Sequence, residues 1–237
     1  MGIGREFYTL MKTIGYTFKD NTYLQIALTH TSYSNEMRSR GFRAESNETL
    51  EFLGDAVLQI IISEELYDKY SKLGEGTLTQ YRQRLVCEKT LSAIAERINL
   101  GDYLNVGTGE ESMCVRTRPK VLADALEAVI AAVYLDDREN GNGILYRAVV
   151  LGLFNYHIDE VIRNTAQDYK TMLQQFVEKN GDSVLAYEYT ESGPEHNKTF
   201  TAIAYVNNNK VGVGTGRTKR AAEMEAARSA LMLFGII

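Results

Sequence analysis

Three acidic residues are spaced so that they share one side of a predicted helix. Glu48, Glu51 and Asp55 occupy positions i, i+3 and i+7. Because an α-helix turns by about 100° per residue, their side chains fall within roughly 60° of one another. The neighbouring residues are mostly apolar, which predicts a largely buried helix. Like charges on such a helix repel one another and lose hydration, and this is tolerated where a cation binds between them.

A second acidic pair, Asp124 and Glu127, lies in another apolar segment with a spacing of three residues. If the two helices pack with their acidic sides together, the carboxylates form an all-oxygen site suited to Mg²⁺ or Mn²⁺. Such an ion activates water and neutralises charge at a phosphodiester, so no Ser, Cys or His nucleophile is required. The alternative is that both acidic faces are solvated, but their apolar neighbours favour the metal site. Glu75, in a glycine-containing segment, carries little information by itself.

A glycine-rich, basic stretch near the C-terminus indicates phosphate binding. Arg217, Lys219 and Arg220 crowd the first turn of a helix that Thr218 is expected to cap. Cations oppose the helix dipole at that end, but together with the free amides they can bind a phosphate backbone. A dinucleotide-binding Rossmann unit is excluded because only about twenty residues follow, too few for a second parallel strand. A solvated basic turn remains the alternative.

Periodic apolar residues predict the elements that position these groups. In the N-terminal part, helices are expected over residues 23–28, 49–67, 77–99, 121–134 and 144–162. A helix over 169–179, strands over 184–190, 198–206 and 210–214, and a helix over 218–234 are expected next, with a turn at residues 207–209. The prediction is an all-α domain over residues 1–162 and an α+β (α-β-β-β-α) domain over 163–237, with a short linker at about 163–167.

Composition narrows the possible classes of protein. The 237 residues include two cysteines and three histidines, which excludes a disulfide-rich scaffold and disfavours a histidine-based metal site. From Thr165 onward the chain carries eight acidic and eight basic residues, so the net charge of −5 lies in residues 1–164. No signal peptide or membrane-spanning stretch is recognisable, and we therefore expect a soluble, cytoplasmic protein.

Several motifs in order resemble the ribonuclease III family. The segment ETLEFLGDAVL, beginning at Glu48, is similar to the family signature. The sequence IGYTFKDNTYLQIALTHTSYSNE precedes it, and LGEGTLTQYRQRLV and VLADALEAVIAAVYLD follow it. The C-terminal part resembles the double-stranded-RNA-binding domain of bacterial members. The resemblance extends over nearly the whole chain, and the succession of motifs is more specific than any one of them.

The resemblance implies an activity and partners. The expected protein is a Mg²⁺-dependent endoribonuclease, with Mn²⁺ as a substitute, that cuts double-stranded RNA and leaves 5′-phosphate and 3′-hydroxyl ends. It would process ribosomal and other structured precursor RNAs as a homodimer, without an organic cofactor or a membrane. One alternative is a catalytically silent RNA-binding or ribosome-associated protein, but every expected acid is present. Another is a phosphohydrolase of small nucleotides, which leaves the C-terminal module unexplained.

The resemblance also assigns roles to residues. Asp55 and Glu127 are expected to be indispensable for catalysis, with Glu48 and Glu75 assisting. The implied metal ligands are Glu51, Asp55, Asp124 and Glu127. The implied RNA contacts are Thr171, Gln174, Gln175, His196, Lys198, Arg217, Lys219 and Arg220. Phe52 matches an aromatic residue of the dimer interface, with an ordinary core position as the alternative. Thr49 and Gln175 depart from the usual family residues, and the loop 38–46 receives no role.

Overall fold

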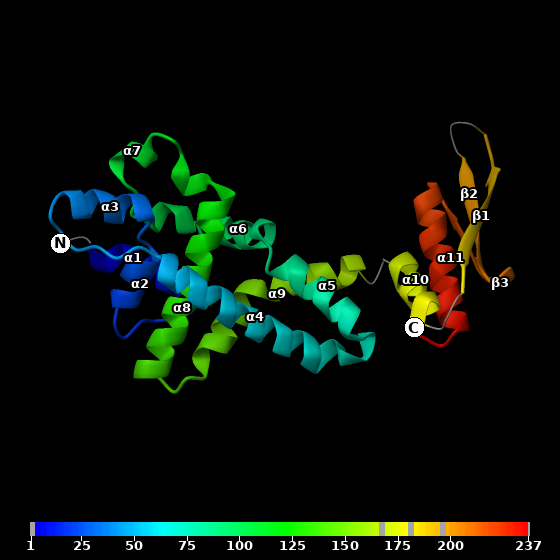
Figure 1. Cartoon of the computed structure of the whole chain (residues 1–237), viewed down its shortest axis with the longest axis horizontal. Helices are drawn as coiled ribbons and strands as arrows, with labels where there is room; N and C mark the ends of the chain where they lie inside the picture. The colour runs from blue at the N-terminus through cyan, green and yellow to red at the C-terminus, as the bar shows by residue number, and fades with distance from the viewer. Residues whose placement is uncertain (1–2, 166–168, 180–182, 195–197, 237) are drawn as a thin grey trace. The chain divides into compact units, whose positions relative to one another are not determined.

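A computed structural model describes residues 3–165, 169–179, 183–194 and 198–236. The chain forms two compact units, Met1–Val161 and Ile162–Ile237, which we call the N-terminal and C-terminal units (Figure 1). Of the described residues, no helix combines the length and hydrophobicity that crossing a membrane requires. The boundary between the two predicted domains stays a prediction.

The N-terminal unit is helical, as its apolar periodicity predicts. Its α-helices are α1 (Ile3–Ile14), α2 (Thr22–Ala27), α3 (Thr31–Ser39), α4 (Glu48–Tyr70), α5 (Glu75–Leu85), α6 (Glu88–Arg97), α7 (Thr108–Glu111), α8 (Pro119–Asn140) and most of α9 (Leu145–Thr165). The last four residues of α9 fall in the C-terminal unit. Short 3₁₀ turns cover Ser71–Leu73, Leu100–Tyr103 and Val115–Thr117. The single helix predicted over residues 77–99 is wrong, because the chain breaks at Val86 and Cys87 into α5 and α6.

The core of this unit is built around α4 and α8, which pack against each other (Figure 1). Leu58 and Ile62 of α4 are buried, as are Leu126 and Val129 of α8. Gly54 sets how closely the helices approach, since a Cβ atom added there would lie 1.8 Å from the backbone oxygen of Glu127. The contact occurs at the level of the acidic residues on both helices.

A buried carboxylate fixes the far end of α8. Asp136 is fully buried and accepts hydrogen bonds from the Tyr16 hydroxyl (2.8 Å) and from the backbone amides of Lys19 and Asp20 (3.0 Å each). A buried carboxylate is tolerated when several donors satisfy its oxygens. This network attaches the connection between α1 and α2 to the C-terminal half of α8.

The C-terminal unit has the predicted α-β-β-β-α order. It comprises α10 (Tyr169–Lys179), β1 (Leu185–Ser192), β2 (Thr199–Val206), β3 (Asn209–Gly216) and α11 (Lys219–Leu233). The strands form an antiparallel sheet in the order β1-β2-β3, with Leu185 opposite Val206 and Phe200 opposite Gly216. Helices α10 and α11 pack together, and α11 packs on β2 and β3 (Figure 1).

Local sequence explains two features of this unit. Asn207 and Asn208 adopt left-handed φ angles of 48° and 66°, as a tight hairpin turn between β2 and β3 requires. A Cβ atom at either Gly212 or Gly214 would lie 2.1 Å from backbone atoms of Ala226 in α11. The glycines of β3 therefore serve close packing of the helix on the sheet.

Candidate active site

Carboxylates from α4 and α8 meet where these helices approach most closely. Glu51, Asp124 and Glu127 each offer an oxygen atom within 4.8 Å of the others, and all three side chains are half-buried. Each comes from a helix whose other side forms the core, so core packing brings the acidic faces together. We refer to these three residues as the acidic cluster.

The environment of the acidic cluster disfavours its negative charge. Burial raises the pKa of Glu127 to about 8, and the charges of Asp55, Glu51 and Asp124 add to this rise. Burial also raises the pKa of Glu51, with a further contribution from Asp124. Carboxyl groups that are held together against their own repulsion gain most from a cation.

The remaining predicted catalytic acids differ in position. The negative charge of Asp55 helps to raise the pKa of Glu127, and the Asp55 carboxylate accepts hydrogen bonds from the Gln59 amide at 3.1 and 3.2 Å. Glu48 accepts a hydrogen bond from the Ser46 hydroxyl at 2.8 Å and adds to the negative field at Glu51. Both therefore border the acidic cluster on α4.

A lysine that the sequence analysis did not single out also reaches the acidic cluster. The ammonium group of Lys120 lies 3.1 Å from a carboxylate oxygen of Asp124, one turn along α8. Its hydrogen bond to Asp124 raises the pKa of Lys120. The i, i+4 spacing of Lys120 and Asp124 could have indicated this pair. Lys120 supplies positive charge beside Glu51 and Glu127 as well, where it lowers the pKa of each.

The donor set fits a hard divalent cation. It consists of carboxylate oxygens from several residues, and these are the ligands that Mg²⁺ and Mn²⁺ prefer. Burial is the main reason that the pKa values of Glu51 and Glu127 are raised, and the neighbouring carboxylates add to the rise, so a cation bound here would relieve both effects. Glu51, Asp124 and Glu127 could hold such an ion, with Asp55 beside them.

The basic segment of the C-terminal unit begins α11 as predicted. The Thr218 hydroxyl accepts a hydrogen bond from the Ala221 amide at 3.1 Å and so caps the helix. Arg217, Lys219 and Arg220 are exposed there, and the Lys219 ammonium lies 5.7 Å from the centre of the Tyr189 ring. These residues form a basic surface at a helix N-terminus, which is favourable for phosphate.

The other predicted RNA contacts lie on α10 and around the β1–β2 connection. The Gln174 amide donates to Glu178 at 2.7 Å, and Lys198 pairs with Glu191 at 3.1 Å. Thr171 and Gln175 lie on α10. His196 lies outside the described residues.

Two family models match the two units. A ribonuclease-III-like model matches residues 20–143, and a double-stranded RNA binding motif matches residues 169–232. Ribonuclease 3 of Caldanaerobacter subterraneus is 44% identical over 230 residues, which covers 96% of this chain and 98% of that protein. The chain belongs to the ribonuclease III family. Ribonuclease 3 of Natranaerobius thermophilus is 43% identical over 227 residues, which covers 95% of this chain and 95% of that protein.

Solved structures agree with this membership in the ribonuclease III family. Two structures of the ribonuclease III nuclease domain from Campylobacter jejuni match with TM-scores of 0.55. They are 37% and 35% identical and cover 62% and 68% of this chain, and 95% and 96% of their own chains. One of them is described as showing structural flexibility in a region involved in dimer formation. The chain thus combines an endoribonuclease domain with a double-stranded-RNA-binding domain.

The ribonuclease III signature helix α4 exposes large apolar side chains. Phe52, Ile60 and Tyr67 are 81%, 55% and 67% exposed, and they fall within about 80° on one side of the helix. We call these three residues the α4 stripe. Because Phe52 is so exposed, the alternative of an ordinary core position within its own unit is wrong.

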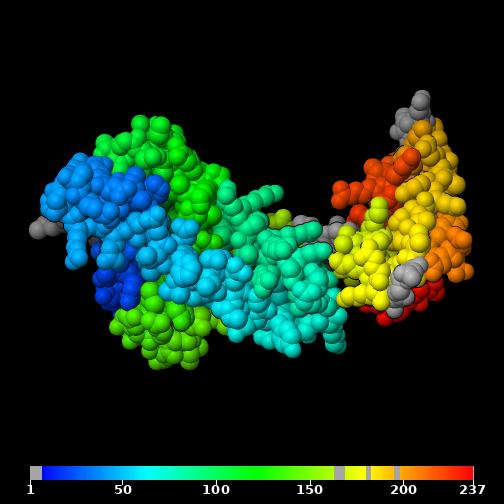
Figure 2. Space-filling model, viewed as in Figure 1, coloured from blue at the N-terminus to red at the C-terminus, as the bar shows by residue number. Residues whose placement is uncertain are grey.

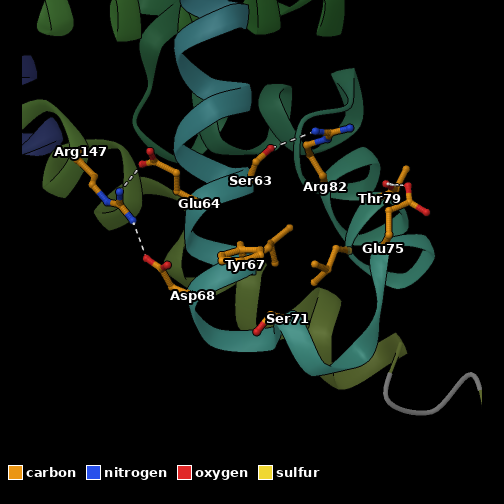
Figure 3. Close-up of a pocket in the computed structure, with 11 residues that line it drawn as sticks. Ser63, Glu64, Tyr67, Asp68, Ser71, Glu75, Thr79, Arg82 and Arg147 are labelled. Atoms are coloured by element: carbon orange, nitrogen blue, oxygen red, sulfur yellow. Dashed lines mark hydrogen bonds and ion pairs between the residues drawn. The ribbon is translucent and has the colours of Figure 1, made fainter.

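Glu75 lies in a separate part of the ribonuclease III domain. It begins α5 and lines a cavity of 670 Å³ between α4 and α5, together with Tyr67 of the α4 stripe (Figure 3). Its carboxylate accepts a hydrogen bond from the Thr79 hydroxyl at 3.1 Å. Glu75 is not among the carboxylates that gather in the acidic cluster, and Tyr67 lies about 24 Å along α4 from Glu51. An assisting role for Glu75 stays a prediction.

Proposed function

We propose that this protein is a double-stranded-RNA-specific endoribonuclease that depends on Mg²⁺, or on Mn²⁺ in its place. The observation that carries the proposal is the acidic cluster on α4 and α8 in a chain that also has a double-stranded-RNA-binding domain. The cluster suits phosphodiester chemistry, and the second domain selects the duplex. A phosphohydrolase of small nucleotides would have no use for that domain.

The acidic residues have different proposed roles in hydrolysis. Glu51, Asp55, Asp124 and Glu127 would hold the divalent ion, which supplies positive charge to stabilise the transition state at the scissile phosphate. Glu127 would hold the ion in its deprotonated form, which burial and the neighbouring charges otherwise disfavour. Water attacks the phosphorus atom and the bond to the 3′-oxygen breaks, which leaves 5′-phosphate and 3′-hydroxyl ends. Asp55 and Glu127 are proposed as indispensable, with Glu48 and Glu75 assisting substrate placement.

The C-terminal unit is proposed to bind A-form RNA by its shape. Phosphate contacts fall on Arg217, Lys219 and Arg220 at the start of α11, where helix amides add to their charge. The proposed minor-groove contacts are Thr171, Gln174, Gln175, His196 and Lys198. Ribosomal and other structured precursor transcripts in the cytoplasm are the proposed substrates.

We also propose that the active form is a homodimer. The α4 stripe is an exposed apolar surface beside the acidic residues of the same helix, which suits contact with a second copy. The Campylobacter jejuni relative is described as having a region involved in dimer formation. Phe52, as the most exposed member of the α4 stripe, is proposed to pack across that interface.

The proposed function is tested by incubating the full chain with long duplex RNA in Mg²⁺ and in Ca²⁺, beside single-stranded RNA and duplex DNA. Cutting of duplex RNA alone, dependent on Mg²⁺ or Mn²⁺, supports the proposal. Duplex binding without cutting under all metal conditions would refute it and indicate a silent RNA-binding protein. Cutting that ignores strandedness would refute the proposed substrate class.

A further inference from the structure

Three arginines lie in the last turn of α3 and in the segment that joins α3 to α4. Arg38, Arg40 and Arg43 fall within six residues that contain no acidic residue, and all three are exposed. The rest of the N-terminal unit is acidic overall. Residues 38 and 39 end α3, so the loop expected over 38–46 begins two residues later. We call residues 38–46, the last two residues of α3 and the connection to α4, the α3–α4 loop. Figure 2 shows the blue region that contains α3 and this loop at the surface of the N-terminal unit.

The C-terminus of α3 holds the beginning of this loop in a defined shape. Gly41 adopts a left-handed φ of 84°, its amide donates to the Arg38 carbonyl at 3.0 Å, and the Phe42 amide donates to the Met37 carbonyl at 2.9 Å. This pair of bonds is a Schellman motif, which ends a helix and fixes the residues that follow. A surface that is ordered before binding loses less entropy when it meets its ligand.

Part of the positive charge of the α3–α4 loop is not neutralised. Arg40 pairs with Glu36 of α3, and Glu36 is also held by Thr108. Within the described part of the chain, neither Arg38 nor Arg43 has an ion-pair partner, and Glu45 is an exposed acid of the same loop. The Phe42 ring between these arginines is 64% exposed. Two cations and an aromatic ring are thus available to a ligand.

The α3–α4 loop is anchored directly at the start of the acidic helix. The Ser46 hydroxyl donates to the Glu48 carboxylate at 2.8 Å, and the Asn47 amide donates to the Thr29 carbonyl at 2.9 Å. Arg43 is five residues before Glu48, so their Cα atoms are separated by at most about 18 Å. This separation is short enough for Arg43 to reach the backbone of a duplex whose scissile phosphate lies at the acidic cluster, and Arg38 precedes Arg43 in the same segment.

We propose that the α3–α4 loop binds the phosphate backbone of duplex RNA beside the cleavage site, with Arg38 and Arg43 as the phosphate contacts and Phe42 against the sugar edge. The inference rests on the proposed function and adds a second RNA-binding surface, on the nuclease domain itself. Its physical reason is charge: an acidic unit that must hold a polyanion needs local cations beside its carboxylates.

The test is duplex binding by the full chain carrying Arg38→Gln and Arg43→Gln. Anisotropy of labelled duplex RNA, in an Asp55→Asn background that keeps the RNA intact, gives Kd as a function of KCl. We expect Kd to rise about tenfold and the slope of log Kd against log salt to fall by about one for each phosphate that the variant no longer binds. With Asp55 present, KM should rise while kcat stays within about twofold of the unsubstituted chain.

Two control variants make the outcome specific. Lys19→Gln with Arg138→Gln also removes two charges and should leave Kd unchanged. Arg138 lies about 21 Å along α8 from Asp124. The Lys19 ammonium donates a hydrogen bond to the Asn140 carbonyl at the same end of α8. Arg38→Lys with Arg43→Lys should restore most of the affinity, because the charges remain. Unchanged Kd and salt slope in the glutamine variant, or an equal loss in the control, overturns the inference. Failure of the proposed function can be distinguished from failure of this inference. If the proposed function is wrong, the unsubstituted chain does not cut duplex RNA, whatever effect the loop variants have on binding.

Discussion

Replacing Gly54 by alanine tests whether the close approach of α4 and α8 builds the acidic cluster. The added methyl group would lie 1.8 Å from the backbone oxygen of Glu127, whereas Cβ atoms essentially never lie within 3.0 Å of another heavy atom. Both atoms belong to helix backbones or are attached directly to them, so no side-chain rotation relieves the clash. The helices must separate by more than an ångström, which moves Glu51 and Asp55 away from Glu127.

The expected cost follows from this overlap. Overpacking a well-packed core costs about 1–3 kcal/mol, and the upper part of this range applies because backbone atoms collide. We therefore expect Gly54→Ala to lower the free energy of unfolding by about 3 kcal/mol, even though alanine favours helix by about 1 kcal/mol. For a unit of this size, that corresponds to a decrease in Tm of about 10 °C. A displacement of about 1 Å at the carboxylates should lower kcat about 100-fold at temperatures where the variant is folded.

The assay is differential scanning calorimetry of the full chain, combined with single-turnover cleavage of duplex RNA. Gly152→Ala is the matched control, because Gly152 lies in α9 and a Cβ atom there would meet nothing within 4 Å. This control should be as stable as the original or more stable, by about 0.5–1 kcal/mol. Equal Tm and kcat for Gly54→Ala and Gly152→Ala would refute the argument that α4 and α8 touch at Gly54.

Three further predictions concern single side chains. Glu127→Gln should remove a pH dependence of the free energy of unfolding that is measured without divalent metal. In the folded protein Glu127 keeps its proton up to about pH 8, whereas the unfolded chain releases it near pH 4.5. The stability of the original chain therefore falls as pH rises between these values. Because Glu127 is only half-buried, we expect the variant to be more stable than the original chain by about 2 kcal/mol at about pH 9, and as stable as the original chain at about pH 4. Urea unfolding at both pH values measures this. A difference in stability that does not change with pH would show that the proton on Glu127 is not its cause. Asp55→Asn should abolish cutting and retain duplex binding in a gel-shift assay, and normal cleavage would eliminate Asp55 as a metal ligand. Phe52→Asp should shift the sedimentation coefficient to that of a monomer while the circular dichroism stays that of a folded protein, because Phe52 is 81% exposed within its own unit; an unaltered dimer would exclude the α4 stripe as the interface.

Local sequence patterns were sufficient for most elements of the fold. The strands and helices of the C-terminal unit follow from alternation and periodicity, and Asn207 and Asn208 form a turn because asparagine tolerates left-handed φ angles. The break between α5 and α6 could not be predicted in this way, since neither glycine nor proline marks Val86 and Cys87. There the Thr90 hydroxyl binds the Arg84 carbonyl at 2.7 Å, an interaction that apolar periodicity does not report.

Helical periodicity is enough to predict which acids share a helix face, because the helical repeat relates Glu48, Glu51 and Asp55 whatever surrounds them. Which of these acids approach α8 depends on how the two helices pack in the folded protein. The missing side chain at Gly54 allows the helices to touch beside Glu127, and burial at that contact raises the pKa of its carboxyl group. Distances between helices depend on side chains far apart in the chain, and helical periodicity carries no information about them.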